Sequence, residues 1–175
     1  LAYALKPHGL LVLGSDDKEV LKLKDSVGRT AITFGTDADA EVSGEDYAIL
    51  YERGETITNP VPIGITFKVR IGGLSFPISV FGVLGRQLVQ PVLAAFALGV
   101  GLKLDLRKLS LSMKQFIPPP GRMRIIPGIQ NSIIIDDTYN ASPVALYEAL
   151  ETLKSVEVSG RRIAVLGDLM ELGKF

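Results

Sequence analysis

The sequence predicts an α/β protein, and two patterns carry that prediction. Ile133–Ile135 and Ile163–Leu166 are short apolar runs typical of buried strands, and an apolar stripe at helical spacing begins between them after Ser142. A strand, a helix and a second strand in this order predict a parallel, right-handed βαβ unit. The other pattern is Ile65–Val80, where apolar and polar residues alternate on both sides of Gly72-Gly73, which predicts a β-hairpin.

The N-terminal part of the chain predicts two strands and one helix. Leu10–Leu13 is an apolar run between two glycines and is expected to be a buried strand. Asp16-Asp17 is expected to open a helix, because acidic residues are favourable at a helix start. Thr30–Phe34 predicts a second strand. From Thr36 to Pro62 the pattern is weak, and only Tyr47–Tyr51 predicts an extended segment.

The remaining elements follow from helical periodicity and from proline. Apolar residues recur at helical spacing over Gln90–Gly99, which predicts a largely buried helix, and Asp105–Phe116 predicts an amphipathic one. Pro118–Gly121 then stops helix and strand alike. We therefore place a domain boundary there, between residues 1–117 and 118–175. Ser142-Pro143 supplies an N-cap and a first-turn proline for the last helix.

Composition excludes several classes of protein. Of the 175 residues 47% are hydrophobic, and 19 basic residues balance 19 acidic ones, so the chain is expected to bury a core and not to bind nucleic acid or anionic lipid through bulk charge. The absence of cysteine excludes disulfides and thiol chemistry and fits a cytoplasmic protein. The longest uncharged runs are shorter than the roughly 18 residues of a membrane helix, so no membrane insertion is expected. Leu1 and Phe175 suggest a piece of a longer chain.

The predicted βαβ unit contains the main candidate site. Asp136–Asn140 follows the first strand and Gly167-Asp168 follows the second, so both loops are expected at the rim where open α/β sheets bind ligands. A carboxylate there can accept hydrogen bonds from a ribose diol or hold Mg²⁺ through water. The alternative is that Asp136 or Asp137 only caps the loop before the helix.

Two further segments could meet an anion. Arg122 follows the prolines, and a guanidinium on a stiff segment suits phosphate or ribose recognition, although a solvated surface arginine is the ordinary alternative. Gly85-Arg86-Gln87 precedes the predicted buried helix, whose N-terminus favours anions. The Gly-x-x-x-x-Gly-Lys-[Ser/Thr] phosphate loop does not occur in this sequence.

Together these segments resemble the Mur ligases, the ATP-dependent amide-forming enzymes of peptidoglycan precursor synthesis. Residues 136–143 are similar to the motif Asp-Asp-Ser-Tyr-Asn-Ala-Asn-Pro, with Ser142 in place of the second asparagine. Residues 161–173 resemble a Val-Leu-Gly-Asp-Met-x-Glu-Leu-Gly stretch, and residues 120–123 match the junction of the family's second and third domains. Residues 5–17 look like the family's Leu-x-x-x-Gly-x-x-Val-Leu-Asn-x-Asp-Asp. The resemblance is specific in residues 118–175 and loose from Thr36 to Gly82.

The resemblance implies a fold and a set of site residues. Residues 1–117 would be the end of a P-loop-type ATPase domain containing the β-hairpin, and residues 118–175 the start of a Rossmann-like C-terminal domain. Arg122 and Asp137 would bind ATP, and Tyr139 and Asn140 would lie near the substrate. At the adenine loop the family has Gly-x-His-Asn-x-x-Asn, whereas this chain has Leu88 and Pro91 at the two asparagine positions. Gln87, at the histidine position, can still donate and accept, so it is the candidate ATP-binding residue of this loop.

The resemblance also implies an activity. The branch of the family most like this chain joins D-Ala-D-Ala to UDP-MurNAc-tripeptide through an acyl phosphate, using ATP and Mg²⁺, with the magnesium ligands mostly outside these residues. No catalytic residue is assigned here, a monomer is expected, and the chain by itself is expected to be inactive. Two alternatives stay open: another amide ligase of this superfamily, of the folylpolyglutamate or cyanophycin type, and a non-catalytic nucleotide-binding remnant.

Overall fold

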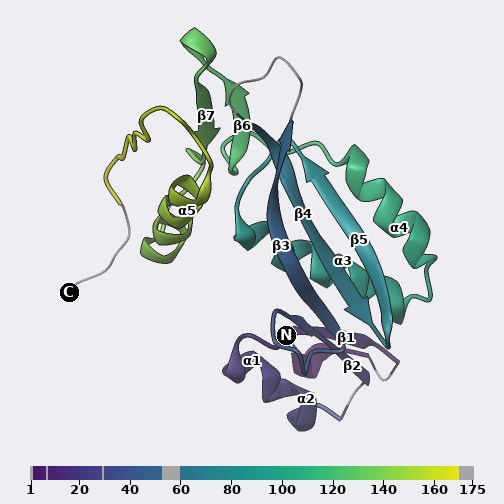
Figure 1. Cartoon of the computed structure of the whole chain (residues 1–175). Coiled ribbons are helices and arrows are strands. Elements are labelled where there is room, and N and C mark those ends of the chain that lie inside the picture. The colour runs from purple at the N-terminus through teal and green to yellow at the C-terminus, as the bar shows by residue number, and fades with distance from the viewer. Residues whose placement is uncertain (1, 7, 29, 53–59, 170–175) are drawn as a thin grey trace. The chain divides into compact units, whose positions relative to one another are not determined.

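The computed structural model describes residues 2–6, 8–28, 30–52 and 60–169 (Figure 1). These residues group into two compact units. The first comprises residues 1–47, 67–78 and 88–115, and the second comprises residues 48–66, 79–87 and 116–175. We describe each unit by itself, and the boundary between residues 117 and 118 stays a prediction.

A five-stranded sheet in the order β1-β2-β3-β4-β5 confirms the mixed α/β class. Its first two strands pair in parallel, with Leu10 opposite Thr30, and the second pairs in parallel with the third, with Phe34 opposite Val42. The weakly patterned region therefore contains a strand longer than the predicted extended segment. The strands are β1 (Leu10–Gly14), β2 (Thr30–Gly35), β3 (Val42–Glu52), β4 (Val61–Ile71) and β5 (Leu74–Phe81).

The predicted hairpin forms between β4 and β5. Gly72 and Gly73 have φ of 52° and 82°, and a two-residue turn with both φ values positive is the kind that matches the twist of the flanking strands. Ile65, Phe67 and Ile78 are almost completely buried, as the alternation predicts, whereas Leu74 beside the turn is 61% exposed.

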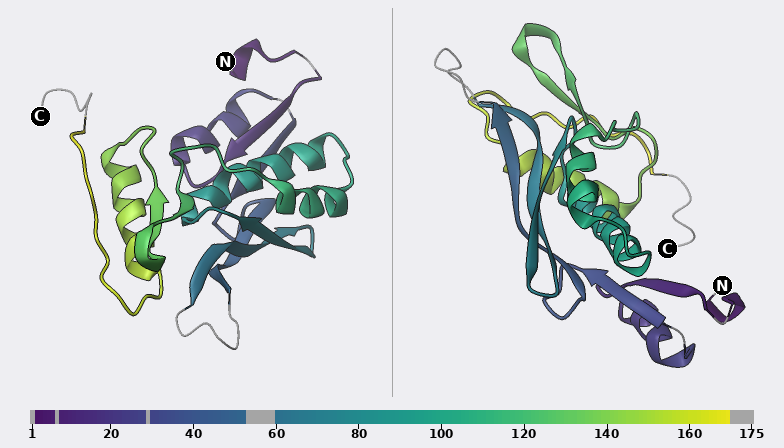
Figure 2. Two further views of the ribbon diagram at one scale, coloured as in Figure 1. Left: turned by 90° about the horizontal axis from the view of Figure 1, so that it is seen from above. Right: turned by 90° about the vertical axis from the view of Figure 1, so that its right-hand side faces the viewer.

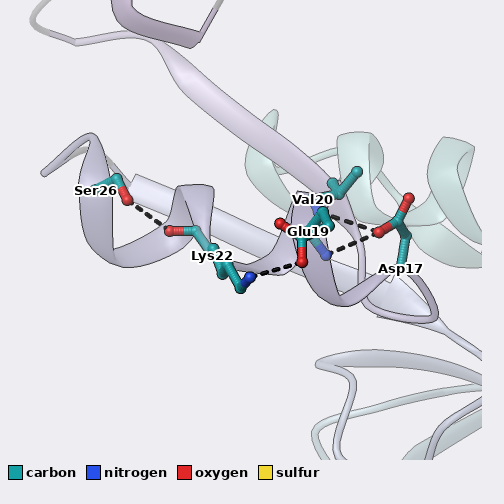
Figure 3. A network of polar contacts seen from close by, with 5 residues as sticks. All are labelled: Asp17, Glu19, Val20, Lys22 and Ser26. Carbon is teal, nitrogen blue, oxygen red and sulfur yellow. Dashed lines mark hydrogen bonds and ion pairs between the residues drawn. The ribbon is translucent and has the colours of Figure 1, made fainter.

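The helix expected after Asp16-Asp17 is present as two short helices, α1 (Lys18–Leu21) and α2 (Leu23–Ser26). Figure 3 shows why the first begins there: Oδ1 of Asp17 accepts hydrogen bonds from the backbone N–H groups of Glu19 at 2.8 Å and Val20 at 3.3 Å. Lys22 pairs with Glu19 at 2.6 Å, and the Ser26 hydroxyl donates to the carbonyl of Lys22.

Two longer helices follow the sheet in the first unit. The buried helix is α3 (Val89–Gly101), and the amphipathic stretch forms the shorter α4 (Leu106–Ser112), which Asp105 caps. Both views of Figure 2 show α3 beside the sheet. Phe96 of α3 is fully buried, with its ring centroid 6.0 Å from that of Phe76 of β5. Short 3-10 turns lie at Ala2–Ala4, Arg86–Leu88, Met113–Gln115 and Ile129–Asn131.

In the second unit, β6 (Arg124–Pro127) and β7 (Ile133–Asp136) form an antiparallel pair. The chain then enters α5 (Pro143–Ser155), which starts as predicted because the Ser142 hydroxyl accepts from the N–H of Ala145 at 3.2 Å. Beyond this helix, the backbone N–H of Glu157 donates to the Tyr51 hydroxyl at 2.8 Å, within the same unit.

The second strand of the predicted βαβ unit is not formed. Residues 163–166 have no regular structure, and Ile163, Val165 and Leu166 are 66%, 93% and 58% exposed. A strand of four residues requires a paired neighbour to satisfy its backbone groups, and no strand among the described residues pairs with this one. The prediction was therefore wrong for this segment. The motif residues Met170–Gly173 lie outside the described residues.

Candidate functional site

The candidate site is built from two loops of the second unit that are joined by backbone hydrogen bonds. The N–H of Gly121 donates to Oδ2 of Asp136 at 3.0 Å, and the N–H of Met123 donates to Oδ1 of Asp137 at 3.2 Å. In the opposite direction, the N–H of Tyr139 donates to the carbonyl of Gly121 at 3.1 Å. These bonds fix residues 121–123 against residues 136–139.

Gly121 is required for this approach. Its φ is +69°, in the left-handed region, and an added Cβ would lie 2.8 Å from the backbone nitrogen of Tyr139. Any side chain at this position would therefore push the two loops apart.

Asp136 has a structural role in the loop. Its Oδ1 accepts from the Thr138 hydroxyl at 2.7 Å and from the Thr138 N–H at 3.3 Å, while its Oδ2 accepts from Gly121. The Thr138 hydroxyl, helped by the backbone donors and Arg124, lowers the pKa of this carboxyl against a smaller opposing effect of burial. For Asp136, the structure agrees with the alternative interpretation of a residue that caps the loop.

Asp137 differs from its neighbour in that one oxygen is unused. Oδ1 accepts from Met123, whereas Oδ2 has no hydrogen-bond partner within the described parts of the chain. Burial raises the pKa of the Asp137 carboxyl, although the Met123 N–H and the charge of Arg122 oppose the shift. A partly buried carboxylate with a free oxygen is suited to accept from a ligand hydroxyl.

Arg122 lies between two buried residues and is itself exposed. Its guanidinium carbon is 4.1 Å from the centroid of the Tyr139 ring, a cation–π contact. No hydrogen bond or ion pair to the described residues occupies its N–H groups. The structure thus brings together three predicted site residues, Arg122, Asp137 and Tyr139.

The predicted adenine loop is connected to this site through the backbone. The N–H of Leu84 donates to the carbonyl of Met123 at 3.0 Å, and the N–H of Ile125 donates to the carbonyl of Gly82 at 2.9 Å. Gln87 follows Leu84 by three residues. Its carboxamide folds over Gly85, and its Oε1 is buried and has no hydrogen-bond partner among the residues that the structure describes. An unpartnered buried acceptor is costly in a folded protein, so this oxygen is a candidate to meet a ligand donor.

Asn140 is held differently from the three clustered residues. Its Oδ1 accepts from the N–H of Ala141 at 2.9 Å, so the carboxamide caps its own loop, and the side chain is exposed. Asp168, expected at the same rim, follows the segment that forms no strand and is also exposed. The structure therefore does not show residues 136–140 and 167–168 meeting at one rim of a sheet, as was predicted.

One polar residue was missed by the sequence interpretation. In the first unit, the Gln90 carboxamide donates to Oδ2 of Asp16, which also accepts from the Thr36 hydroxyl and backbone N–H. This bond joins the start of α3 to the loop after β1. The sequence signal that could have pointed to Gln90 is its position three residues after Gln87, close to one helical turn.

Neither a metal centre nor a membrane span is found in the part of the chain that the structure describes. No three His, Cys, Asp or Glu side chains are grouped there as metal ligands would be, so we assign no Mg²⁺ ligand to those residues. None of the helices described is long and apolar enough to cross a bilayer.

The family model and the relatives found by comparison with known proteins are all those of Mur ligases. Residues 121–175 match the family model described as the Mur ligase, glutamate ligase domain. The UDP-N-acetylmuramoyl-tripeptide–D-alanyl-D-alanine ligase of Buchnera aphidicola is 27% identical over 97% of this chain and 35% of its own length. The UDP-N-acetylmuramate–L-alanine ligase of Chlorobium phaeovibrioides is 29% identical over 90% of this chain and 31% of its own length.

Solved structures show the same fold. MurF from Acinetobacter baumannii superposes with a TM-score of 0.72 at 20% identity, over 89% of this chain and 31% of that one. MurF ligase from Thermotoga maritima, solved in complex with ADP, gives a TM-score of 0.63 at 20% identity, over 86% of this chain and 31% of that one. Nearly all of this chain is matched in these comparisons, but it spans only about a third of the length of each relative.

Proposed function

We propose that the full-length protein containing this chain forms an amide bond in peptidoglycan precursor synthesis and consumes ATP in doing so. The support is the match of residues 121–175 to the Mur ligase family model and the similarity of the chain to Mur ligases. The observation that carries the proposal is the cluster of Arg122, Asp137 and Tyr139, which presents unused cationic donors beside a free carboxylate oxygen. A ribose diol requires an acceptor and a phosphate requires donors, so this cluster fits the ribose and phosphates of a nucleotide.

We propose the following roles for the site residues. Oδ2 of Asp137 accepts from a ribose hydroxyl, and the guanidinium of Arg122 binds the ribose or phosphates. Gln87 contacts the adenine with the carboxamide whose oxygen is now unpaired. Asn140 lies near the entry of the incoming dipeptide. ATP supplies the activation of the substrate carboxylate as an acyl phosphate, and the chain's residues bind and orient it.

For the substrates we propose UDP-MurNAc-tripeptide and D-Ala-D-Ala. The support is the similarity to the Buchnera enzyme over 97% of this chain, together with the Asp-Asp-Thr-Tyr-Asn motif. The similarity to the Chlorobium L-alanine ligase favours a second candidate, a ligase of the same family that adds L-alanine to UDP-MurNAc.

The test is phosphate release by the full-length protein. Release that requires ATP, UDP-MurNAc-tripeptide and D-Ala-D-Ala together is expected, and release that requires UDP-MurNAc and L-alanine would select the second candidate. Folates supplied together with glutamate, and cyanophycin primers supplied with amino acids, test the other ligase types of the superfamily. The proposal would be contradicted if none of these substrates caused phosphate release and the protein did not bind ADP. We expect the 175-residue chain alone to show no turnover under the same conditions.

A further inference from the structure

Arg122 and Tyr139 form a cation–π pair, and a backbone hydrogen bond joins their two loops. The ring centroid and the guanidinium carbon are 4.1 Å apart, and the N–H of Tyr139 donates to the carbonyl of Gly121, the residue just before Arg122. The left-handed conformation of Gly121 turns the chain at this point. The main chain therefore holds the two residues next to each other, with the guanidinium carbon over the ring.

A cation–π contact leaves the hydrogen-bond donors of an arginine unused. The ring attracts the positive charge of the guanidinium electrostatically and accepts no conventional hydrogen bond from its N–H groups. Among the described residues, no acceptor occupies those donors. An unsupported exposed arginine would sample many rotamers and lose that freedom on binding an anion.

From this geometry we infer that Tyr139 is a positioning residue: its ring holds the Arg122 guanidinium in place for the nucleotide. The inference rests on the proposed function, which gives Arg122 the ribose or phosphates of ATP as its ligand. It differs from the sequence expectation that Tyr139 itself meets the peptide substrates.

The two roles predict different kinetics. A positioning role raises the KM for ATP and the Kd for ADP when the ring is lost, and leaves the KM for the incoming dipeptide unchanged. If Tyr139 instead contacted the dipeptide, loss of the ring would raise the KM for the dipeptide and leave the KM for ATP and the Kd for ADP unchanged. An exposed cation–π contact corresponds to a change of about two- to fivefold in affinity.

The experiment uses the full-length protein with Tyr139→Phe, Tyr139→Leu and phenylalanines of increasing fluorine content at this position. Phe keeps the ring and is expected to behave within about twofold of the wild type. Fluorination keeps the ring's size and removes its negative face, so the Kd for ADP is expected to rise stepwise with fluorine content. Tyr147 is another exposed aromatic residue, on α5, so Tyr147→Leu is the matched control and should leave the Kd for ADP unchanged.

An Arg122→Ala background completes the test, because the effect of Tyr139→Leu on ADP affinity should disappear in it. The inference fails if fluorination leaves the Kd for ADP unchanged, if the dipeptide KM changes instead, or if the two substitutions are additive. The fluorinated series decides the matter even if Tyr139→Leu does not fold. Wild-type protein that neither binds ADP nor turns over would instead refute the proposed function.

Discussion

The N–H of Met123 donates to Oδ1 of Asp137 at 3.2 Å, while two residues earlier Gly121 donates to the neighbouring carboxylate of Asp136. Adjacent acidic residues thus hold one loop together, yet folding shifts their pKa values in opposite directions. The difference arises because Asp136 is surrounded by three donors, whereas the charge of Asp137 is partly removed from water.

The first prediction concerns stability at neutral pH. Asp136→Asn should lower the Tm, because Asn has one acceptor oxygen where the carboxylate uses two. Asp137→Asn should keep the Met123 bond and raise the Tm, because it removes a charge that burial disfavours. Thermal unfolding of the two variants at pH 7 checks the opposite signs, and equal shifts in one direction would contradict the assignment.

The pH dependence follows from the same pKa shifts. The pKa of Asp136 is lowered by folding, so its stabilisation is present above the unfolded pKa of 3.8 and is lost as the pH falls through the folded value. The pKa of Asp137 is raised, so its contribution is full below 3.8 and is lost as the pH rises through the folded value. The Tm differences between wild type and the two Asn variants should therefore shrink when unfolding is repeated at a pH below the folded-state pKa of both carboxyls.

A second prediction tests the close approach at Gly121. Gly121→Ala should destabilise the protein by about 2 kcal/mol or more, because it combines a left-handed backbone with a Cβ 2.8 Å from the nitrogen of Tyr139. Gly72→Ala is the control, since Gly72 also has a positive φ but open space around its Cβ, and it should cost about 1 kcal/mol. Chemical denaturation measures both, and an equal loss would show that the contact with Tyr139 is unimportant.

Gln87 should show a trade between stability and binding. Gln87→Leu removes a buried oxygen without a partner, an arrangement that costs about 1–3 kcal/mol, so the Tm should stay the same or rise. The same change should weaken ADP binding if the carboxamide meets the adenine. Calorimetric titration with ADP, compared with a ribose-phosphate lacking the base, separates a lost base contact from a general loss of affinity. A lower Tm with unchanged binding would argue that the oxygen is satisfied.

The start of α5 gives a fourth prediction. Ser142→Ala removes the acceptor for the N–H of Ala145 and should destabilise the protein by about 1 kcal/mol. Ser142→Asn, which restores the residue of the family motif, should be neutral because asparagine is an equally good N-cap. Thermal unfolding of both variants checks this, and equal losses would indicate that the serine contributes through something other than its cap.

Local features were predicted well because they depend on neighbouring residues. The hairpin at Gly72-Gly73, the cap at Ser142 and the buried stripe of α3 each follow from turn chemistry, capping or periodicity over a few residues. The motifs likewise singled out Arg122 and Asp137 as candidates, and the structure brings their two loops together. The segment Ile163–Leu166 was predicted incorrectly because apolarity alone makes no strand without a pairing partner.

The sequence by itself determined the α/β class, most of the elements and the resemblance to the Mur ligases, which residues 121–175 and the relatives bear out. Only the tertiary structure decided how the acidic pair is used, with Asp136 committed to the loop and Asp137 left with a free oxygen. It also decided that the guanidinium of Arg122 lies over the ring of Tyr139, a residue seventeen positions further along the chain. Such relationships depend on which backbone donors the folded loops bring to each side chain, and residue identity and spacing carry no information about that.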